Sequence, residues 1–298
     1  MITVSALTKT YGARTAVDNL TFGVTAGRVT GFVGPNGAGK STTMRMMVGL
    51  TRPDSGDVRY DGVSYTDLAH PARVVGSVLD ARCMHPGRTA LMHLRATAAL
   101  SGIPARRAEA VLAEVGLESA AGQRAGKFSL GMRQRLALAG ALLGDPQVLL
   151  LDEPSNGLDP DGIRWLRNYL TAFAARGGTV FVSSHLISEL EMFADDLVVV
   201  GRGSLLAAES VEAIAARNEI TVVVETSQPD RLAGLLADHG IAVDVAGTRL
   251  HVTGTTKSAV SQIAFDNRIH VLELTEAARS LEDSLLEMTS SSAEFAST

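Results

Sequence analysis

The chain has 298 residues, of which 32 are acidic and 27 are basic, giving a formal net charge of −5; this balance argues against a nucleic-acid-binding surface. Cys83 is the only cysteine, so no internal disulfide forms, and the opening residues lack the basic flank and apolar run of a signal peptide. We therefore expect a protein of the reducing cytoplasm, with one domain of roughly 200 residues and a smaller one of about 80 to 100.

The longest apolar tract, LALAGALLG, runs from Leu136 to Gly144 and is stopped by Asp145. A helix needs about 20 apolar residues to cross a bilayer. The sequence therefore predicts no transmembrane segment, and any step across a membrane would belong to another chain.

The glycine-rich stretch FVGPNGAGKST, residues 32–42, matches the phosphate-loop pattern G-x-x-x-x-G-K-[ST]. An apolar run precedes it and a run with helical spacing follows it, which favours this interpretation over a glycine-rich turn with a chance lysine. Backbone N–H groups of such a loop point at phosphates, the lysine adds a positive charge, and the next hydroxyl can bind Mg²⁺. The predicted phosphate-binding residues are Gly34, Pro35, Asn36, Gly37, Ala38, Gly39, Lys40, Ser41 and Thr42, with Ser41 also at the metal.

Residues 1–217 alternate short apolar runs with longer helical ones, which predicts an α/β domain with a parallel sheet. Between about 81 and 145, Ala, Leu and Arg recur at helical spacing with little strand character. This part is predicted to be a helical insert within the α/β domain.

Two adjacent carboxylates follow the apolar run VLLLDEP, residues 148–154. Acid pairs at strand ends are common, but this one follows a phosphate loop, and phosphate hydrolysis needs both a metal ligand and a base. We expect Asp152 to hold Mg²⁺, directly or through water. Glu153 is then the expected general base that polarises the attacking water.

The sequence changes character after Asn218. Residues 218–289 follow the order β-α-β-β-α-β with a closing helix, ARSLEDSLLEM, which predicts a small ferredoxin-like α+β domain. The last residues, 290–298, are small and polar, so we expect them to be disordered.

Three further segments complete a resemblance to the nucleotide-binding subunit of an ABC transporter: FSLGMRQR from Phe128, SNGLDP from Ser155 and TVFVSSH from Thr179. The family signature LSGGQ-x-QR stands here as FSLGM-R-QR, and the resemblance covers about residues 1–217. It implies a P-loop NTPase with ATP and Mg²⁺. It also implies a head-to-tail homodimer, in which each ATP lies between the phosphate loop of one copy and the signature of the other.

The resemblance assigns roles to five more residues. Tyr11 would stack on the adenine, although a tyrosine at a strand end is otherwise more often packing. His185 would reach the γ-phosphate, whereas a lone histidine is otherwise usually structural. Ser129 and the N–H of Gly131 would contact the γ-phosphate held by the second copy, and Asp159 would cross the dimer interface.

The sequence departs from the family at three positions. Asp80 stands where the family has a glutamine that touches Mg²⁺; a carboxylate can also bind magnesium, but it adds negative charge beside Asp152 and Glu153. In the signature, Leu130 and Met132 replace a glycine and a glutamine, which suggests a less permissive turn and slow or partner-dependent hydrolysis. Nearby, Cys83 and His85 alone are too few ligands for a metal site.

The ending SLEDSLLEMT, residues 280–289, resembles the close of ATPases that serve two-component exporters, including drug and antibiotic self-resistance systems. We therefore predict an ATP-hydrolysing subunit that powers a separate integral membrane permease from the inner face of the cell membrane. The C-terminal domain would regulate or dimerise, or only stabilise the chain.

Two other functions stay open at this stage. A soluble ABC-type ATPase acting on ribosomes or nucleic acid is disfavoured by the single phosphate loop and the absence of a heptad run. A regulator that binds ATP without turnover would fit the altered signature, but Lys40, Asp152, Glu153 and His185 are all present.

Overall fold

The computed structural model describes residues 1–80, 84–216 and 220–278. Cys83, the closing helix predicted after Ala278 and the predicted disordered tail lie outside these residues. The described chain divides after Val211 into two compact units. The domain boundary predicted after residue 217 stays a prediction.

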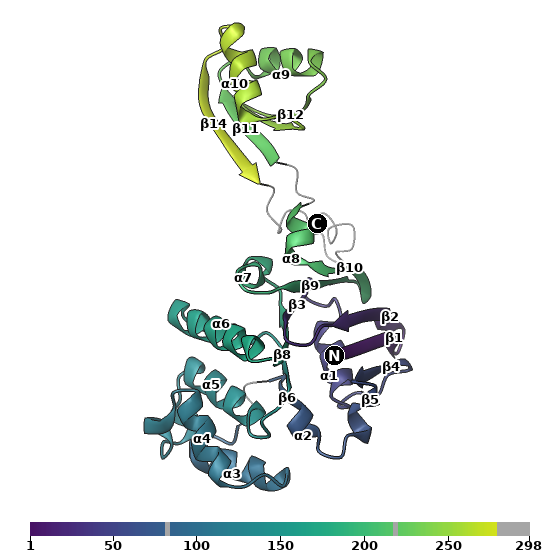
Figure 1. The fold of residues 1–298 in the computed structure, drawn as a ribbon, viewed down its shortest axis with the longest axis vertical. Coiled ribbons are helices and arrows are strands. Elements are labelled where there is room, and N and C mark those ends of the chain that lie inside the picture. Colours follow the sequence, from purple (N-terminus) through teal and green to yellow (C-terminus); the bar gives the residue numbers. More distant parts are fainter. Residues whose placement is uncertain (81–83, 217–219, 279–298) are drawn as a thin grey trace. The chain divides into compact units, whose positions relative to one another are not determined.

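Unit 1 contains two sheets and a group of helices (Figure 1). Its strands are β1 (Ile2–Tyr11), β2 (Arg14–Val24), β3 (Val29–Val33), β4 (Ser55–Tyr60), β5 (Val63–Ser64), β6 (Val75–Val78), β7 (Val148–Leu151), β8 (Thr179–Ser184), β9 (Asp196–Gly201) and β10 (Ser204–Ser210). Its helices are α1 (Lys40–Met47), α2 (Pro71–Val74), α3 (Ala90–Leu100), α4 (Arg106–Glu114), α5 (Leu130–Ala141), α6 (Pro160–Ala175) and α7 (Ile187–Glu191), with 3₁₀ turns at Tyr65–Asp67, Glu118–Ala120 and Ala125–Lys127.

The larger sheet has the order β10-β9-β3-β8-β7-β6, and all its pairs are parallel except β9 with β10. Every residue of β3, β7 and β8 is buried, which is typical of central parallel strands covered on both faces. Parallel strands end at the same edge of a sheet. The segments that follow β3, β6, β7 and β8 therefore meet there, and they carry the phosphate loop, Asp80, the two acids and His185.

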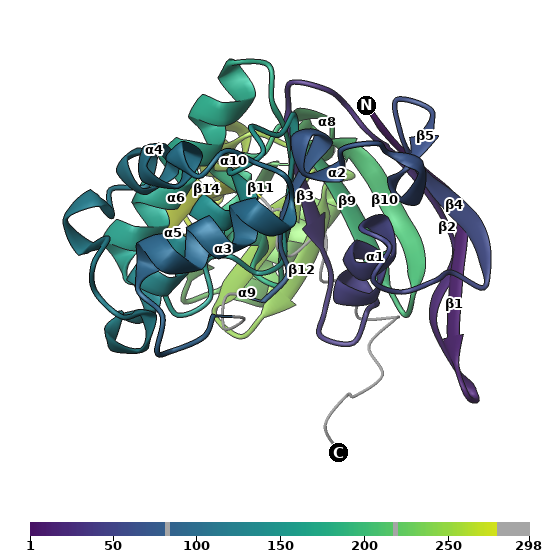
Figure 2. The same ribbon diagram turned by 90° about the horizontal axis from the view of Figure 1, so that it is seen from below.

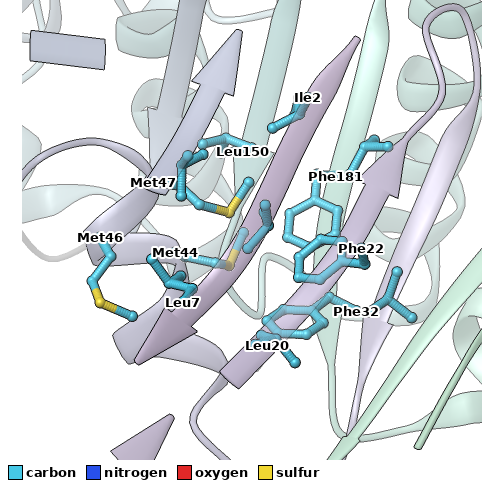
Figure 3. Close-up of a cluster of buried hydrophobic side chains, with 14 of the residues drawn as sticks. Ile2, Leu7, Leu20, Phe22, Phe32, Met44, Met46, Met47, Leu150 and Phe181 are labelled. Atoms are coloured by element: carbon cyan, nitrogen blue, oxygen red, sulfur yellow. The ribbon is translucent and has the colours of Figure 1, made fainter. Parts of the chain in front are cut away.

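The smaller sheet, β2-β1-β4-β5, is antiparallel and packs with the larger sheet around a shared core. Figure 3 shows the rings of Phe22, Phe32 and Phe181 lying together, with Met44 and Met47 of α1 beside them. The ring centroids are 5.6 Å apart for Phe22 and Phe181 and 5.0 Å apart for Phe32 and Phe181. Burial of each such side chain contributes about 1.5–3 kcal/mol, so this cluster holds α1 and the phosphate loop against both sheets.

The helical segment expected from the sequence is present as α3, α4 and α5, which contact one another. Figures 1 and 2 both show this group on one side of unit 1, with the antiparallel sheet on the other. Leu94, Leu112 and Leu136 are fully or almost fully buried in these helices. Thr89 caps α3 by accepting a hydrogen bond from the Met92 N–H, as expected at a helix start.

Unit 2 begins within α8 (Val211–Ala216), at Glu212, and continues with β11 (Ile220–Thr226), α9 (Pro229–Asp238), β12 (Ala242–Ala246), β13 (Arg249–Thr253), α10 (Lys257–Asp266) and β14 (Val271–Ala278). The sheet order is β12-β13-β11-β14, and every pair is antiparallel. This confirms the predicted ferredoxin-like fold. Alternate residues such as Val222 and Leu250 are buried against Leu232 and Val260 of the two helices.

Candidate functional site

The phosphate loop joins β3 to α1, and two of its positions have room only for glycine. Gly39 precedes α1 with φ +99°, and a Cβ there would lie 2.4 Å from the carbonyl oxygen of Ala16. A Cβ on Gly34 would lie 2.3 Å from the carbonyl oxygen of Val200. Because no other residue fits either position without moving backbone, the loop keeps the close turn that lets its N–H groups surround an anion.

Lys40 is the first residue of α1, and its side chain is only 6% exposed. Its ammonium nitrogen, Nζ, donates to the carbonyl oxygens of Gly34 at 2.7 Å and Pro35 at 3.4 Å. The same atom lies 3.4 Å from Oε1 of Glu153. The loop therefore holds a positive charge at its centre, next to the predicted base.

Ser183 organises the two acids that follow β7. Its buried hydroxyl donates to Oδ1 of Asp152 at 2.6 Å and accepts from the backbone N–H of Glu153 at 2.9 Å. The parallel register of β7 and β8 sets this contact, because Leu151 is paired with Val182. One side chain thus fixes both the carboxylate of Asp152 and the backbone of Glu153.

Glu153 has a strained backbone and two side-chain partners. Its φ is +49°, in the left-handed region, which costs about 1 kcal/mol or more in a residue other than glycine. Its Oε2 lies 2.7 Å from Nδ1 of His185, and its Oε1 faces Lys40. An ionised carboxylate only accepts hydrogen bonds, so Nδ1 is the protonated nitrogen in this contact. Such strain is kept where the surroundings impose it and is often found at active sites.

A cavity of about 460 Å³ lies over the phosphate loop. This volume is in the range that accommodates a small-molecule ligand or cofactor. The cavity is lined by Tyr11, Arg14, Ala16, Pro35, Asn36, Gly37, Ala38, Gly39, Lys40, Ser41, Thr42, Glu153, Asn156 and His185. Most of the predicted nucleotide-binding residues thus line this one cavity. Tyr11 also lines it, and its side chain is half exposed.

The structure adds four residues to those found in the sequence: Ser183, which holds the acids, and Arg14, Ala16 and Asn156, which line the cavity. Arg14 is paired with Tyr11 across the turn between β1 and β2, and its guanidinium lies within 3.3 Å of the position a Cβ on Gly37 would take. Asn156 and Ser183 lie in the segments SNGLDP and TVFVSSH, but the resemblance gave neither of them a role. Arg14 and Ala16 lie on β2 and belong to no short motif.

Six predicted site residues do not line this cavity: Gly34, Asp80, Ser129, Gly131, Asp152 and Asp159. Ser129 caps α5 by accepting from the Met132 N–H at 3.2 Å, and Asp159 caps α6 by accepting from the Gly162 N–H at 2.9 Å. Both side chains thus stabilise helix starts within the chain. The resemblance assigns Ser129 and the N–H of Gly131 to the γ-phosphate held by a second copy, and Asp159 to the dimer interface.

The altered signature does not strain the backbone. Leu130 is the first residue of α5, and neither Leu130 nor Gly131 has a positive φ. The expectation that a leucine makes this turn less permissive was therefore wrong, because a helical residue needs none of the conformational freedom of glycine.

The predicted Mg²⁺ ligands are few, but their chemistry suits a metal that is also bound by phosphates. Among the described residues no group of three or more His, Cys, Asp or Glu side chains could hold a metal ion. Mg²⁺ in nucleotide sites, however, needs only one or two carboxylates together with phosphate oxygens and water. The Ser183 bond occupies only Oδ1 of Asp152, so Asp152 with Ser41 fits such a site, and Asp80 follows the neighbouring strand β6, paired with β7.

The geometry defines a phosphate-loop ATPase domain, and comparison with known proteins identifies its family. Residues 17–156 match the ABC transporter family, and residues 220–282 match a domain of unknown function, DUF8746. The chain is 36% identical to the uncharacterized ABC transporter ATP-binding protein YhcH of Bacillus subtilis strain 168, over 95% of this chain and 94% of that protein. It is 35% identical to the bacitracin transport ATP-binding protein BcrA of Bacillus licheniformis, over 95% of both chains.

Solved structures that resemble this chain come from the same family as these relatives. The dimeric structure of MJ0796, a bacterial ABC transporter cassette, matches 71% of this chain and 99% of its own, with a TM-score of 0.65 and 26% identity. The chain therefore belongs to the ATP-binding subunits of ABC transporters, and it binds and hydrolyses ATP. Within the described residues, no helix has the length and apolar character needed to span a membrane.

Proposed function

We propose that this ATPase works as a homodimer that drives a separate integral membrane permease of a drug- or antibiotic-exporting system, on the inner face of the cell membrane. The supporting observation is the match to the bacitracin transport protein BcrA over 95% of both chains, which includes unit 2. A soluble ATPase acting on ribosomes or nucleic acid is less well supported, because the names of the relatives point to transport.

In this proposal the nucleotide occupies the cavity over the phosphate loop. Tyr11 stacks on the adenine, and the loop N–H groups from Gly34 to Thr42 and the ammonium of Lys40 bind the phosphates. Ser41, Asp152 and Asp80 would hold Mg²⁺. The metal would neutralise charge on the β- and γ-phosphates.

The contacts of Glu153 suggest how its role changes on binding. Lys40 Nζ now lies between loop carbonyls and Oε1 of Glu153. Phosphates attract the ammonium more strongly than a neutral carbonyl does, so Lys40 turns towards them. Glu153 then keeps its bond to His185 and has Oε1 available for the attacking water.

Hydrolysis then proceeds by a water oxygen attacking the γ-phosphorus while Glu153 accepts the water proton. The bond from the γ-phosphorus to the bridging oxygen breaks, and ADP leaves with its electron pair. Ser129, the N–H of Gly131 and Asp159 complete the site from the second copy. Binding of ATP between two copies favours the closed dimer, and its hydrolysis removes that preference.

Glu153→Gln tests this scheme, because glutamine keeps the shape of the side chain but cannot accept the proton. We expect ATP binding to persist, turnover to fall at least about a hundred-fold, and an ATP-dependent dimer to accumulate on size exclusion. Glu191→Gln, an exposed change on α7, is the matched control and should behave as the wild type. A Glu153→Gln protein that binds ATP but stays monomeric would contradict the proposal.

A further inference from the structure

Helix α5, which begins within the signature FSLGMRQR, contacts the segment 154–159 through two leucine–glycine pairs. Leu130 of α5 packs on Gly157, where a Cβ would lie 2.3 Å from Leu130 Cδ2. In the other direction, Leu158 reaches Gly131, where a Cβ would lie 3.7 Å from Leu158 Cδ2. The side chain that replaces the family glycine at position 130 is therefore in direct contact with the SNGLDP loop.

Two polar contacts extend this interface along α5. The buried Gln134 donates from Nε2 to the carbonyl oxygen of Pro154 at 2.6 Å. At the next residue of α5, the guanidinium of Arg135 lies 4.0 Å from the ring centroid of Trp165 on α6, a cation–π distance. The contacts thus run from the residue after Glu153 to the first turns of α6.

We propose that Leu130 is a positioning residue for ATP hydrolysis. By filling the space beside Gly157, it fixes the SNGLDP loop to α5, so that Ser129 and Asp159 keep a constant separation. Because Pro154 is bound to the same helix, the backbone of Glu153 is set by α5 as well. A glycine at position 130 has no side chain to make this contact. The part that concerns Ser129 and Asp159 rests on the proposed dimer, whereas the link to Glu153 does not.

The test is a double-mutant cycle with Gly157→Ala in the wild-type and Leu130→Gly backgrounds, measured on the full chain without a permease. Gly157 has φ +72°, so alanine is strained there in both backgrounds, and only the clash with Leu130 differs between them. We expect Gly157→Ala to lower kcat about ten-fold in the wild type but only about two-fold in Leu130→Gly, which itself loses several-fold. The Kd for a fluorescent ATP analogue should stay within about two-fold throughout, because neither residue lines the cavity.

A second readout does not depend on turnover. Trp165 is the only tryptophan, and its contact with Arg135 makes its fluorescence a report on the docking of α5 to α6. We expect Gly157→Ala to shift this emission, and the double variant to return it towards that of Leu130→Gly. Gly102→Ala is the matched control: Gly102 also has a positive φ, +64°, but nothing lies within 4 Å of its Cβ position.

Two outcomes would overturn the role of Leu130, and a third bears only on the proposed function. Equal effects of Gly157→Ala in the two backgrounds, in both kcat and emission, would overturn the role of Leu130. A loss of kcat that follows a matching loss of nucleotide affinity would also overturn it. Failure to find a permease would count against the proposed function and leave this cycle unaffected.

Discussion

Ser183 connects the two acids that follow β7. Its hydroxyl is buried, and it serves as donor to Asp152 and acceptor for the N–H of Glu153. A hydrogen bond to a charged group contributes about 1.5–3 kcal/mol. If that contribution is made in the transition state, its loss slows turnover about ten- to a hundred-fold.

We therefore predict that Ser183→Ala lowers kcat by about this factor and leaves the KM for ATP little changed, because Ser183 does not line the nucleotide cavity. Steady-state phosphate release measures both values. Thr30→Val is a matched control, since the Thr30 hydroxyl is also buried in the larger sheet but has no hydrogen-bond partner among the described residues. Equal kcat values for the two variants would show that the Ser183 bonds do not serve catalysis.

At the scale of elements, α3 contains a histidine whose protonation opposes folding. His93 is partly buried, its Nδ1 has no hydrogen-bond partner within the described residues, and Arg88 lies nearby. Burial, and then the charge of Arg88, lower the pKa of His93 from 6.5. The folded chain thus binds this proton more weakly than the unfolded chain does, so the stability contributed by neutral His93 is complete above pH 6.5 and falls as the pH drops towards the lowered pKa.

Urea unfolding of unit 1 at pH ~7.5 and pH ~5.5 measures this effect. We expect His93→Gln to lose less stability than the wild type on acidification, because glutamine carries no proton-binding group. His70→Gln, an exposed change in the same unit, should keep the pH dependence of the wild type. The interpretation fails if His93→Gln is as sensitive to acid as the wild type.

Some elements of the fold and of the site could be predicted from the sequence, and others could not. The phosphate loop, the acid pair and the end of β8 are local motifs, and the alternation of strands and helices predicted the parallel sheet and the ferredoxin-like unit. The antiparallel sheet β2-β1-β4-β5 was not predicted. The hydrogen bonds of Ser183 and the contact of Leu130 with Gly157 join segments that are distant in the chain, and Arg14 is placed by the turn between β1 and β2, so no short motif predicted these contacts.

At the scale of the whole molecule, the described residues supply the ATP site but no membrane-spanning helix. The relatives that match over 94–95% of their length are ATP-binding proteins of transporters, and they match unit 2 as well as unit 1. The transported compound would be selected by the permease. We therefore expect this chain to work bound to a separate permease.

The most direct measurement is to tag the full chain, solubilise native membranes in mild detergent, and identify the proteins that stay bound. We predict a multi-span membrane protein in near-equal amount to this chain. Recovery of the chain only in the soluble fraction, with ribosomal proteins or with no partner, would contradict the proposed function.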